Sequence, residues 1–263
     1  VKDYIHQRGI SDFSVEKFEI GYAPISADTI NFLKSNHYNL TDAIDLGIID
    51  TGTNGLYSRF IERITFPIYS ISGKLVGFGG RTITGHNAKY VNSPQTKLFN
   101  KSKLLYGYQI AKEYIYKKNQ IIVCEGYLDV IMLHQAGFNT AVATLGTALT
   151  ADHLPLLRRG EPKVILAYDG DKAGLAAAFK ASVMLSQSEF EGGVIIFADG
   201  MDPADMVNKN KVEELNEIFA NPISFTPYAI DYIISKYDIN DANQKQKALI
   251  ESNEYLKSLG LIY

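Results

Sequence analysis

Acidic residues follow three apolar runs in the second half of this chain. The runs are IIVC, VILAY and VIIFA: Glu125 follows the first, Asp169 and Asp171 the second, and Asp199, Asp202 and Asp205 the third. Carboxylate oxygens with no His or Cys among them are the ligands that Mg²⁺ and Mn²⁺ prefer. The pattern therefore predicts a divalent-cation site, provided that the fold brings these acids together.

The elements around these acids alternate between strand and helix. Apolar patterns predict strands over 121–124, 140–144, 164–171 and 193–200, and helices over 127–137, 150–160 and 172–187. This alternation predicts a parallel sheet with helices on both faces. Ligands gather at the carboxyl ends of such strands, so Glu125, Asp169 and Asp171 should converge. Taken alone, Asp169-Gly170-Asp171 is more simply interpreted as the capped start of a helix. The three acidic strand ends taken together favour the cation site instead.

The first half of the chain has a mixed pattern. Helical patterns cover 15–23 and 28–38, and two β-rich runs flank a turn at 72–74, which predicts a hairpin over 64–83. A polar loop over 84–103 follows, and it is long for a simple connector. Gly77, Gly79 and Gly80 in the second run either admit a nucleic-acid backbone or permit a β-bulge.

Charge is distributed unevenly. Residues 59–118 hold eleven Lys or Arg and two acids, whereas residues 119–214 hold seven Lys or Arg and thirteen acids. A polyanion held beside metal-binding carboxylates would suit this arrangement, and ordinary solvated surface explains it equally well. We expect an α/β protein in three parts: a basic mixed subdomain over 1–118, a parallel-sheet subdomain over 119–214, and a helical subdomain over 215–263.

Composition narrows the class of protein. Cys124 is the single cysteine, which excludes an internal disulfide and a Cys-based zinc site within this chain. We expect it to pack as a core residue, and His134 and His153 to be structural. The chain starts at Val1 without a signal-like segment, so we expect a piece of a longer, cytoplasmic protein. The apolar runs are too short to span a membrane, and the P-loop pattern is absent.

Several motifs carry a resemblance to a known family. EGYLDVIMLHQAG, AVATLGTALTADH, VILAYDGDKAGLAAA and FADGMDPADMV resemble the Toprim domain, which primases, topoisomerases and some nucleases share. The segments RITFPI, GKLVGFGGR, KYVNSP and LFNKSKLLYG resemble motifs of the bacterial DNA primase branch in particular. The resemblance runs in unbroken order over about residues 1–220.

The resemblance implies a role for individual residues. The residues that match the family's metal ligands are Glu125, Asp169, Asp171 and Asp202. Asp129 matches a further acid of the active centre that is not a ligand. Matched to nucleotide-binding residues are Lys89, Tyr90, Lys101, Gly126 and Asp129. Matched to basic residues along the DNA or phosphate path are Arg63 and Arg81, together with Lys89 and Lys101. The family often reads Asp-Pro-Asp where this chain has Asp202-Pro203-Ala204, so Asp205 either replaces the missing acid or caps a helix.

Three residues of the polar loop keep two interpretations. Tyr90 is placed either to stack on a base or as an ordinary surface tyrosine. Asn92 and Ser93 either bind a sugar or phosphate, or stabilise the loop.

The resemblance implies synthesis of short RNA primers on single-stranded DNA from ribonucleoside triphosphates. Two or more Mg²⁺ or Mn²⁺ ions would assist this phosphoryl transfer. It further implies a monomer at the bacterial replication fork. A zinc-binding domain and a helicase-binding domain would lie outside this chain. The alternatives are a Toprim nuclease or topoisomerase fragment, a haloacid-dehalogenase-like phosphatase, and a non-catalytic DNA-binding module.

Overall fold

The computed structural model describes residues 1–85 and 88–260. His86 and Asn87 of the polar loop lie outside the described residues, as does the side chain of Asp199. The chain folds into two compact units. Unit 1 comprises Val1–Lys112 and Gly126–Thr147, and unit 2 comprises Glu113–Glu125 and Ala148–Tyr263. The units group residues by packing and not by chain order, so the three consecutive parts expected from the sequence remain a prediction.

Unit 1 is built on a four-stranded antiparallel sheet. Its strands lie in the order β1 (Gly21–Ala23), β4 (Arg63–Tyr69), β5 (Leu75–Thr82) and β6 (Tyr90–Asn92). The predicted hairpin is confirmed as β4 and β5, with Gly73 in the left-handed region at φ 78°. The helix predicted over 15–23 is wrong beyond Lys17, because the chain extends there to pair β1 with β4.

The glycines of β5 make room for aromatic rings. A Cβ at Gly79 would lie 2.3 Å from the Tyr127 ring, and a Cβ at Gly77 would lie 2.6 Å from Phe99. At Gly80 the nearest atom is in Phe60, also at 2.6 Å. A register shift lies opposite Gly77, between Ile68 and Tyr69. The bulge interpretation therefore holds at one glycine, and close ring packing explains all three.

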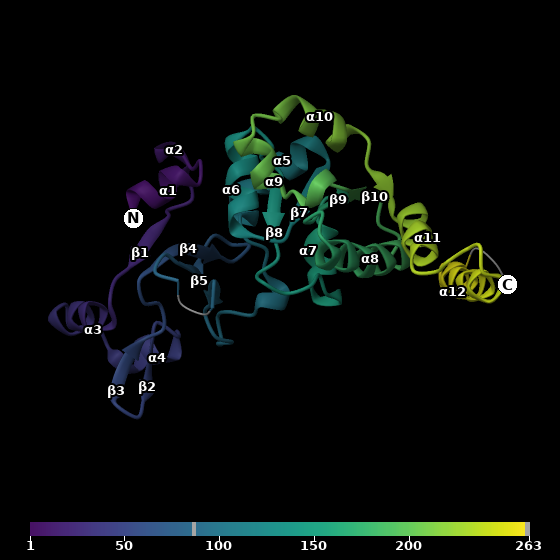
Figure 1. The fold of residues 1–263 in the computed structure, drawn as a ribbon. Helices are drawn as coiled ribbons and strands as arrows, with labels where there is room; N and C mark the ends of the chain where they lie inside the picture. The colour runs from purple at the N-terminus through teal and green to yellow at the C-terminus, as the bar shows by residue number, and fades with distance from the viewer. Residues whose placement is uncertain (86–87, 261–263) are drawn as a thin grey trace. The chain divides into compact units, whose positions relative to one another are not determined.

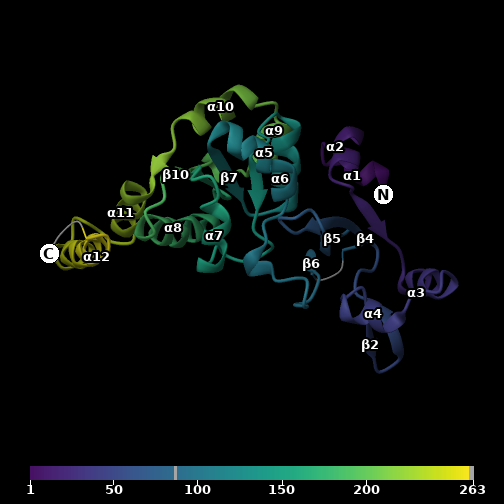
Figure 2. The same cartoon turned by 180° about the vertical axis from the view of Figure 1, so that it is seen from behind.

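Figures 1 and 2 label most of the remaining elements of unit 1, among which β2 (Ile49–Gly52) and β3 (Gly55–Ser58) form a separate two-stranded sheet. The others are α1 (Lys2–Gln7), α2 (Asp12–Lys17), α3 (Ser26–Ser35), α4 (Leu40–Asp45), the 3₁₀ turn η1 (Lys101–Lys103), α6 (Tyr127–Gln135) and β8 (Ala141–Ala143). α5 (Tyr108–Lys118) runs from unit 1 into unit 2.

A second sheet confirms the predicted parallel topology. Its order is β11 (Ile223–Ser224), β10 (Gly192–Ile195), β9 (Lys163–Ala167), β7 (Gln120–Cys124) and β8. β7 pairs with β9 in parallel, and β9 pairs with β10 in parallel. Their apolar side chains are buried, Cys124 among them, as expected for strands covered on both faces. β11 adds an antiparallel edge that the sequence pattern does not reveal.

Helices complete unit 2. They are α7 (Leu154–Leu157), α8 (Lys172–Gln187), α9 (Pro203–Asn208), α10 (Val212–Ala220), α11 (Phe225–Ser235) and α12 (Ala242–Ser258), with the 3₁₀ turns η2 (Ala151–His153) and η3 (Ala198–Gly200). α11 packs along α8, as both views of the ribbon show. Among the described residues, no helix is long and apolar enough to cross a membrane.

Candidate active site

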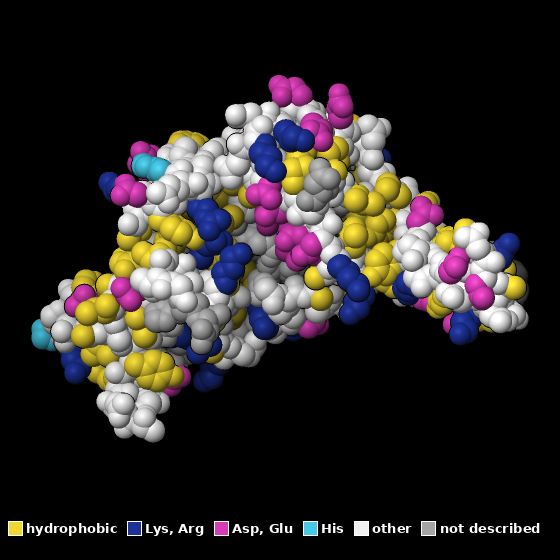
Figure 3. Space-filling view, in the orientation of Figure 1, with side chains coloured by type: hydrophobic (Ala, Val, Ile, Leu, Met, Phe, Trp, Pro, Cys, Tyr) yellow, Lys and Arg dark blue, Asp and Glu magenta, His cyan; other side chains and the backbone are white. Residues whose placement is uncertain are grey.

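The predicted acids stand at one edge of the parallel sheet. Glu125 directly follows β7, Asp169 comes two residues after β9, and Asp202 follows β10 and begins α9. Because β10, β9 and β7 are parallel neighbours, their carboxyl ends reach the same edge of the sheet. We call the carboxylates of Glu125, Asp169, Asp171, Asp202 and Asp205 the acidic edge. Figure 3 shows magenta side chains near the middle of the view, where Figure 1 draws α9 and β7.

Short contacts tie the acidic edge to the backbone. The Asp169 backbone N–H donates to Glu125 Oε1 at 3.2 Å, which joins the ends of β9 and β7. Asp171 caps α8 by accepting from the Gly174 N–H at 2.7 Å. Asp202 caps α9 in the same way, accepting from the Asp205 N–H at 2.6 Å. Each carboxylate accepts several bonds, so capping does not exhaust it.

The electrostatics of the acidic edge show that the acids lie close together. Burial, followed by the charges of Glu125, Asp202, Asp171 and Asp205 in that order, together raise the pKa of Asp169 to about 7. Burial also raises the pKa of Glu125, with a contribution from Asp171, against the opposing Asp169 N–H. Every charged neighbour that shifts Asp169 is itself acidic. Such a cluster repels itself until a cation joins it.

Asp205 belongs to this acidic cluster and also lies in the first turn of α9. Its side chain is exposed in the first turn of α9, and its charge contributes to the raised pKa of Asp169. Its backbone, and not its carboxylate, forms the cap with Asp202. Asp205 therefore lies near the position where Ala204 supplies no acid.

Two glycines allow the close approach of these loops. A Cβ at Gly174 would lie 2.2 Å from the Asp169 carbonyl oxygen and 2.9 Å from Glu125 Oε1. A Cβ at Gly170 would lie 2.3 Å from the Phe197 carbonyl oxygen, and the Gly170 N–H donates to the Met201 carbonyl at 3.0 Å. Backbone contacts this short exclude any side chain, so glycine is required at both positions.

Asp129 and Gly126 have a different placement from the acidic edge. Both belong to unit 1, where Asp129 is buried and accepts from the Gly126 N–H at 3.1 Å. This bond caps the start of α6. A catalytic or nucleotide-binding role for either residue remains a prediction.

The predicted cations of unit 1 divide into two kinds. Lys89 and Lys101 are exposed, whereas Arg63 and Arg81 are only 6% and 5% exposed. Burial lowers the pKa of Arg63, which stays charged at neutral pH because guanidinium is strongly basic. The DNA-binding role predicted for the two arginines remains a prediction, and their burial directs attention to their contacts within the chain.

Arg81 is held by two tyrosines. Its Nε donates to the Tyr4 hydroxyl at 2.6 Å, and its Nη1 donates to the Tyr90 hydroxyl. The guanidinium also lies over the Tyr90 ring, 5.1 Å from the centroid. The Arg81 guanidinium therefore contacts both the hydroxyl and one face of the Tyr90 ring, and these contacts fix the orientation of the ring.

The structure favours the loop-stabilising interpretation of Asn92 and Ser93. Asn92 Oδ1 accepts from the Tyr127 hydroxyl at 2.6 Å, and its Nδ2 donates to the Leu145 carbonyl at 2.8 Å. Ser93 Oγ accepts from the Phe78 N–H at 2.9 Å. The Asn92 bonds link β6 with α6 and with the 144–147 loop, and the Ser93 bond links the end of β6 with β5, all inside unit 1.

Comparison with known proteins identifies the family. Residues 1–112 match the family described as "DNA primase catalytic core, N-terminal domain", and residues 119–198 match the Toprim domain. The RNA polymerase domain of the Mycobacterium tuberculosis primase superposes with a TM-score of 0.87 at 32% identity, over 98% of this chain and 85% of that one. The Escherichia coli primase catalytic core gives 0.83 at 31% identity, over 100% and 91%.

The chain belongs to the bacterial DNA primase family. A DNA primase of Helicobacter pylori is 48% identical over 263 residues, which cover 99% of this chain and 46% of that protein. One from Campylobacter jejuni is 49% identical over 251 residues, which cover 95% and 42%. The chain thus spans about half the length of the curated primases it matches. The resemblance read from the motifs is confirmed.

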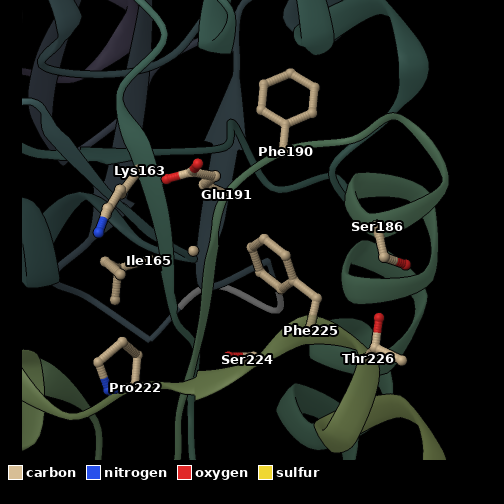
Figure 4. A pocket seen from close by; sticks show the side chains of 10 residues that line it. Lys163, Ile165, Ser186, Phe190, Glu191, Pro222, Ser224, Phe225 and Thr226 are labelled. Atoms are coloured by element: carbon tan, nitrogen blue, oxygen red, sulfur yellow. The ribbon is translucent and has the colours of Figure 1, made fainter.

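The chain also has a pocket away from the acidic edge (Figure 4). Its volume is about 470 Å³, and its lining includes Lys163 and Gly192, which begin β9 and β10. It therefore lies at the amino ends of these strands, opposite the ends that carry the acids. Phe190, Phe225 and Thr226 come from the segments that close it.

Sequence reasoning missed several residues that position the predicted site residues. Tyr4 and Tyr127 hold Arg81 and Asn92, respectively, and Gly174 makes room for Asp169. No local pattern marks the two tyrosines, because their partners are distant in the chain. The glycine could have been noticed, since it interrupts the first turn of an otherwise Ala-rich helix.

Proposed function

We propose that this chain is a polymerising core that joins ribonucleotides into short RNA primers on single-stranded DNA. The observation that carries the proposal is the acidic edge, where three adjacent strand ends bring carboxylates together around Asp169. Burial and these neighbouring charges together raise the pKa of Asp169 to about 7. Family membership supports it, as does the related structure of a primase catalytic domain bound to single-stranded DNA, which is 31% identical to this chain. We place the activity in the bacterial cytoplasm, where replication takes place.

Divalent cations fit the chemistry of the acidic edge. Its donors are all carboxylates, which suit Mg²⁺ or Mn²⁺, and its repulsion would be relieved by a positive charge. Glu125, Asp169, Asp171 and Asp202 would hold the ions, with Asp205 beside them. Among the residues that the structure describes, no three His, Cys, Asp or Glu side chains are yet grouped as a metal site. Side-chain rotation at this edge would therefore accompany binding.

Bound ions would activate the 3′ hydroxyl of the primer and stabilise the leaving pyrophosphate. The chain's own residues would place the reactants. Lys89 and Lys101 carry exposed charges for the triphosphate, and Tyr90 offers a ring braced by Arg81. Gly126 and Asp129 stand at the start of α6 as further nucleotide-binding candidates. Lys89, Lys101 and Arg81 would also supply positive potential for the template backbone. The helicase contact implied by the family remains a proposal for the longer protein.

One assay tests this proposal against its nearest alternative. The chain is incubated with single-stranded DNA, Mg²⁺ or Mn²⁺, and labelled ribonucleoside triphosphates. We expect RNA oligomers from the unaltered chain and from Glu213→Ala, an exposed acid of α10, and none from Asp169→Ala. Cleaved DNA without RNA would instead assign the acidic edge to a Toprim nuclease. If neither RNA nor cleaved DNA is formed, the proposal is contradicted.

A further inference from the structure

Arg63 directs its hydrogen bonds to the segment that carries Lys89. It begins β4, and its Nη1 donates to the Gly80 carbonyl at 3.3 Å and to the Lys89 carbonyl at 3.4 Å. Its Nη2 donates to the Ala88 carbonyl at 2.9 Å. Three carbonyl oxygens of the chain itself therefore surround the guanidinium. A buried cation requires such partners, because an unpaired one would be costly to desolvate.

The sheet is shaped to let this side chain through. A Cβ at Gly80 would lie 3.2 Å from Arg63 Cδ and 2.6 Å from the Phe60 ring. A Cβ at Gly80 would require the Arg63 stem to shift by a few tenths of an ångström, and it would clash with the Phe60 ring. The glycine thus serves the reach of Arg63 as well as the ring.

The Lys89 carbonyl has donors from two neighbouring strands. Besides Arg63 from β4, the Thr82 N–H at the end of β5 donates to it at 3.1 Å. The next residue, Tyr90, pairs opposite Arg81 at the start of β6. The Lys89 side chain is exposed. The backbone of Lys89 is therefore fixed from two sides while its side chain faces solvent.

We propose that Arg63 is a positioning residue for nucleotide binding: it fixes the backbone of Ala88 and Lys89, and it does not touch the template. The proposal rests on the proposed function, in which Lys89 and Tyr90 hold the incoming nucleotide. It replaces the template-lining role expected for Arg63 from the resemblance. Its physical reason is that Arg63 is only 6% exposed and its guanidinium is directed at three carbonyls of the chain, so it is not presented to a phosphate at the surface.

Kinetics with two substitutions separate positioning from template contact. Arg63→Met removes the donors, and Arg63→Lys keeps the charge without the planar fork. We expect both to raise the KM for ribonucleotides about fivefold or more, with template affinity unchanged. The slope of log affinity against log salt should also stay the same, whereas loss of one phosphate contact on a single strand lowers it by about 0.7. Full rescue by lysine, or a lowered slope, would overturn the proposal.

A double-mutant cycle tests whether Arg63 acts through Lys89. Lys89→Met alone should raise the ribonucleotide KM, and adding Arg63→Met should raise it little further. Fully additive effects would contradict a role through Lys89. Lys74→Met is the matched control, because Lys74 is exposed in the turn of the same hairpin, and it should change neither KM nor template affinity.

Hydrogen exchange gives a readout that does not depend on RNA synthesis. In Arg63→Lys and Arg63→Met, backbone amides of residues 88–92 should exchange at least about tenfold faster than in the unaltered chain, because their strand end has lost its anchor. Unchanged exchange in Arg63→Lys would overturn the proposal even if Arg63→Met fails to fold. If the unaltered chain makes no RNA, the proposed function fails, and this measurement still decides whether Arg63 holds the segment.

Discussion

Two regions of this molecule place charged side chains in opposite ways. The acidic edge of unit 2 brings together carboxylates of one sign, and burial and these charges together raise the pKa of Asp169 to about 7. The four-stranded sheet of unit 1 buries Arg63 and Arg81, but neutral oxygens of the chain itself accept from both. The buried cations of the sheet have hydrogen-bond acceptors that offset their desolvation, whereas the carboxylates of the acidic edge repel one another. A costly cluster of like charges is typical of a site that uses them.

The largest effect should come from Asp169→Asn, which keeps the shape and removes the charge. We expect RNA synthesis to fall by more than about 100-fold, since losing a metal ligand costs more than losing its supporting contacts. The melting temperature without divalent metal should stay equal or rise, because repulsion is relieved. Primer-synthesis assays and thermal unfolding in EDTA measure both. Retention of most activity would show that the acidic edge is misassigned.

Arg81→Met should show the reverse pattern, with stability lost first. The hydroxyls of the half-buried Tyr4 and Tyr90 would lose their partner, at a cost of about 1–3 kcal/mol. Urea unfolding measures this loss. Lys97→Met, an exposed lysine in the same unit, serves as the control and should change stability by less than about 0.5 kcal/mol. An Arg81→Met protein as stable as the control would break the comparison.

Gly79→Ala should damage unit 1 through sterics alone. The new Cβ would meet the Tyr127 ring at 2.3 Å, and overpacking of this kind costs about 1–3 kcal/mol. Gly73→Ala is unsuitable as a control because of its positive φ. Val76→Ala, in the same strand and half-buried, is better matched. In chemical denaturation, Gly79→Ala should have a lower free energy of unfolding than Val76→Ala. The opposite order would refute the packing assigned to the glycine.

The smallest effect should come from acid acting on His134. Burial and the charge of Lys17, opposed by the hydrogen bond to the Ala141 carbonyl, together lower its pKa to about 4. The unfolded chain takes up this proton near pH 6.5 and the folded chain does not, so stability present above pH 6.5 falls as the pH drops toward 4. Between about pH 7.5 and 5.5 the loss should be about 1 kcal/mol.

His134→Gln tests that assignment, because glutamine cannot titrate in this range. The variant should lose less stability than the unaltered chain over the same pH interval, as measured by urea unfolding at each pH. Identical losses would mean that His134 is charged in the folded protein.

The acidic edge was predictable because its signals are local. Buried strands read as short apolar runs, and the acids follow them directly, so Glu125, Asp169 and Asp171 could be assigned to one rim from the sequence. The short strand β11 could not be predicted, since two residues carry no period. The sequence pattern predicts helix at the extended segment β1, because the pairing of β1 with β4 is a tertiary contact that no local pattern records.

The contacts of the basic residues were not predictable. A sequence shows that Arg63 is positively charged and says nothing of whether its partner is a phosphate or a carbonyl. Its partners Ala88 and Lys89 reach it through strand pairing. The glycines of β5 likewise depend on rings brought from distant segments, such as Tyr127. Charge patterns therefore located the basic region without revealing which of its cations are buried.

Thermal unfolding in the presence of Mn²⁺ tests the central claim most directly. An ion that binds only the folded acidic edge must raise the melting temperature with its concentration. We expect this rise in the unaltered chain and in Glu213→Ala, and its loss in Asp169→Asn. An equal rise in all three proteins, or none in the unaltered chain, would contradict the account of the acidic edge as the metal-binding centre.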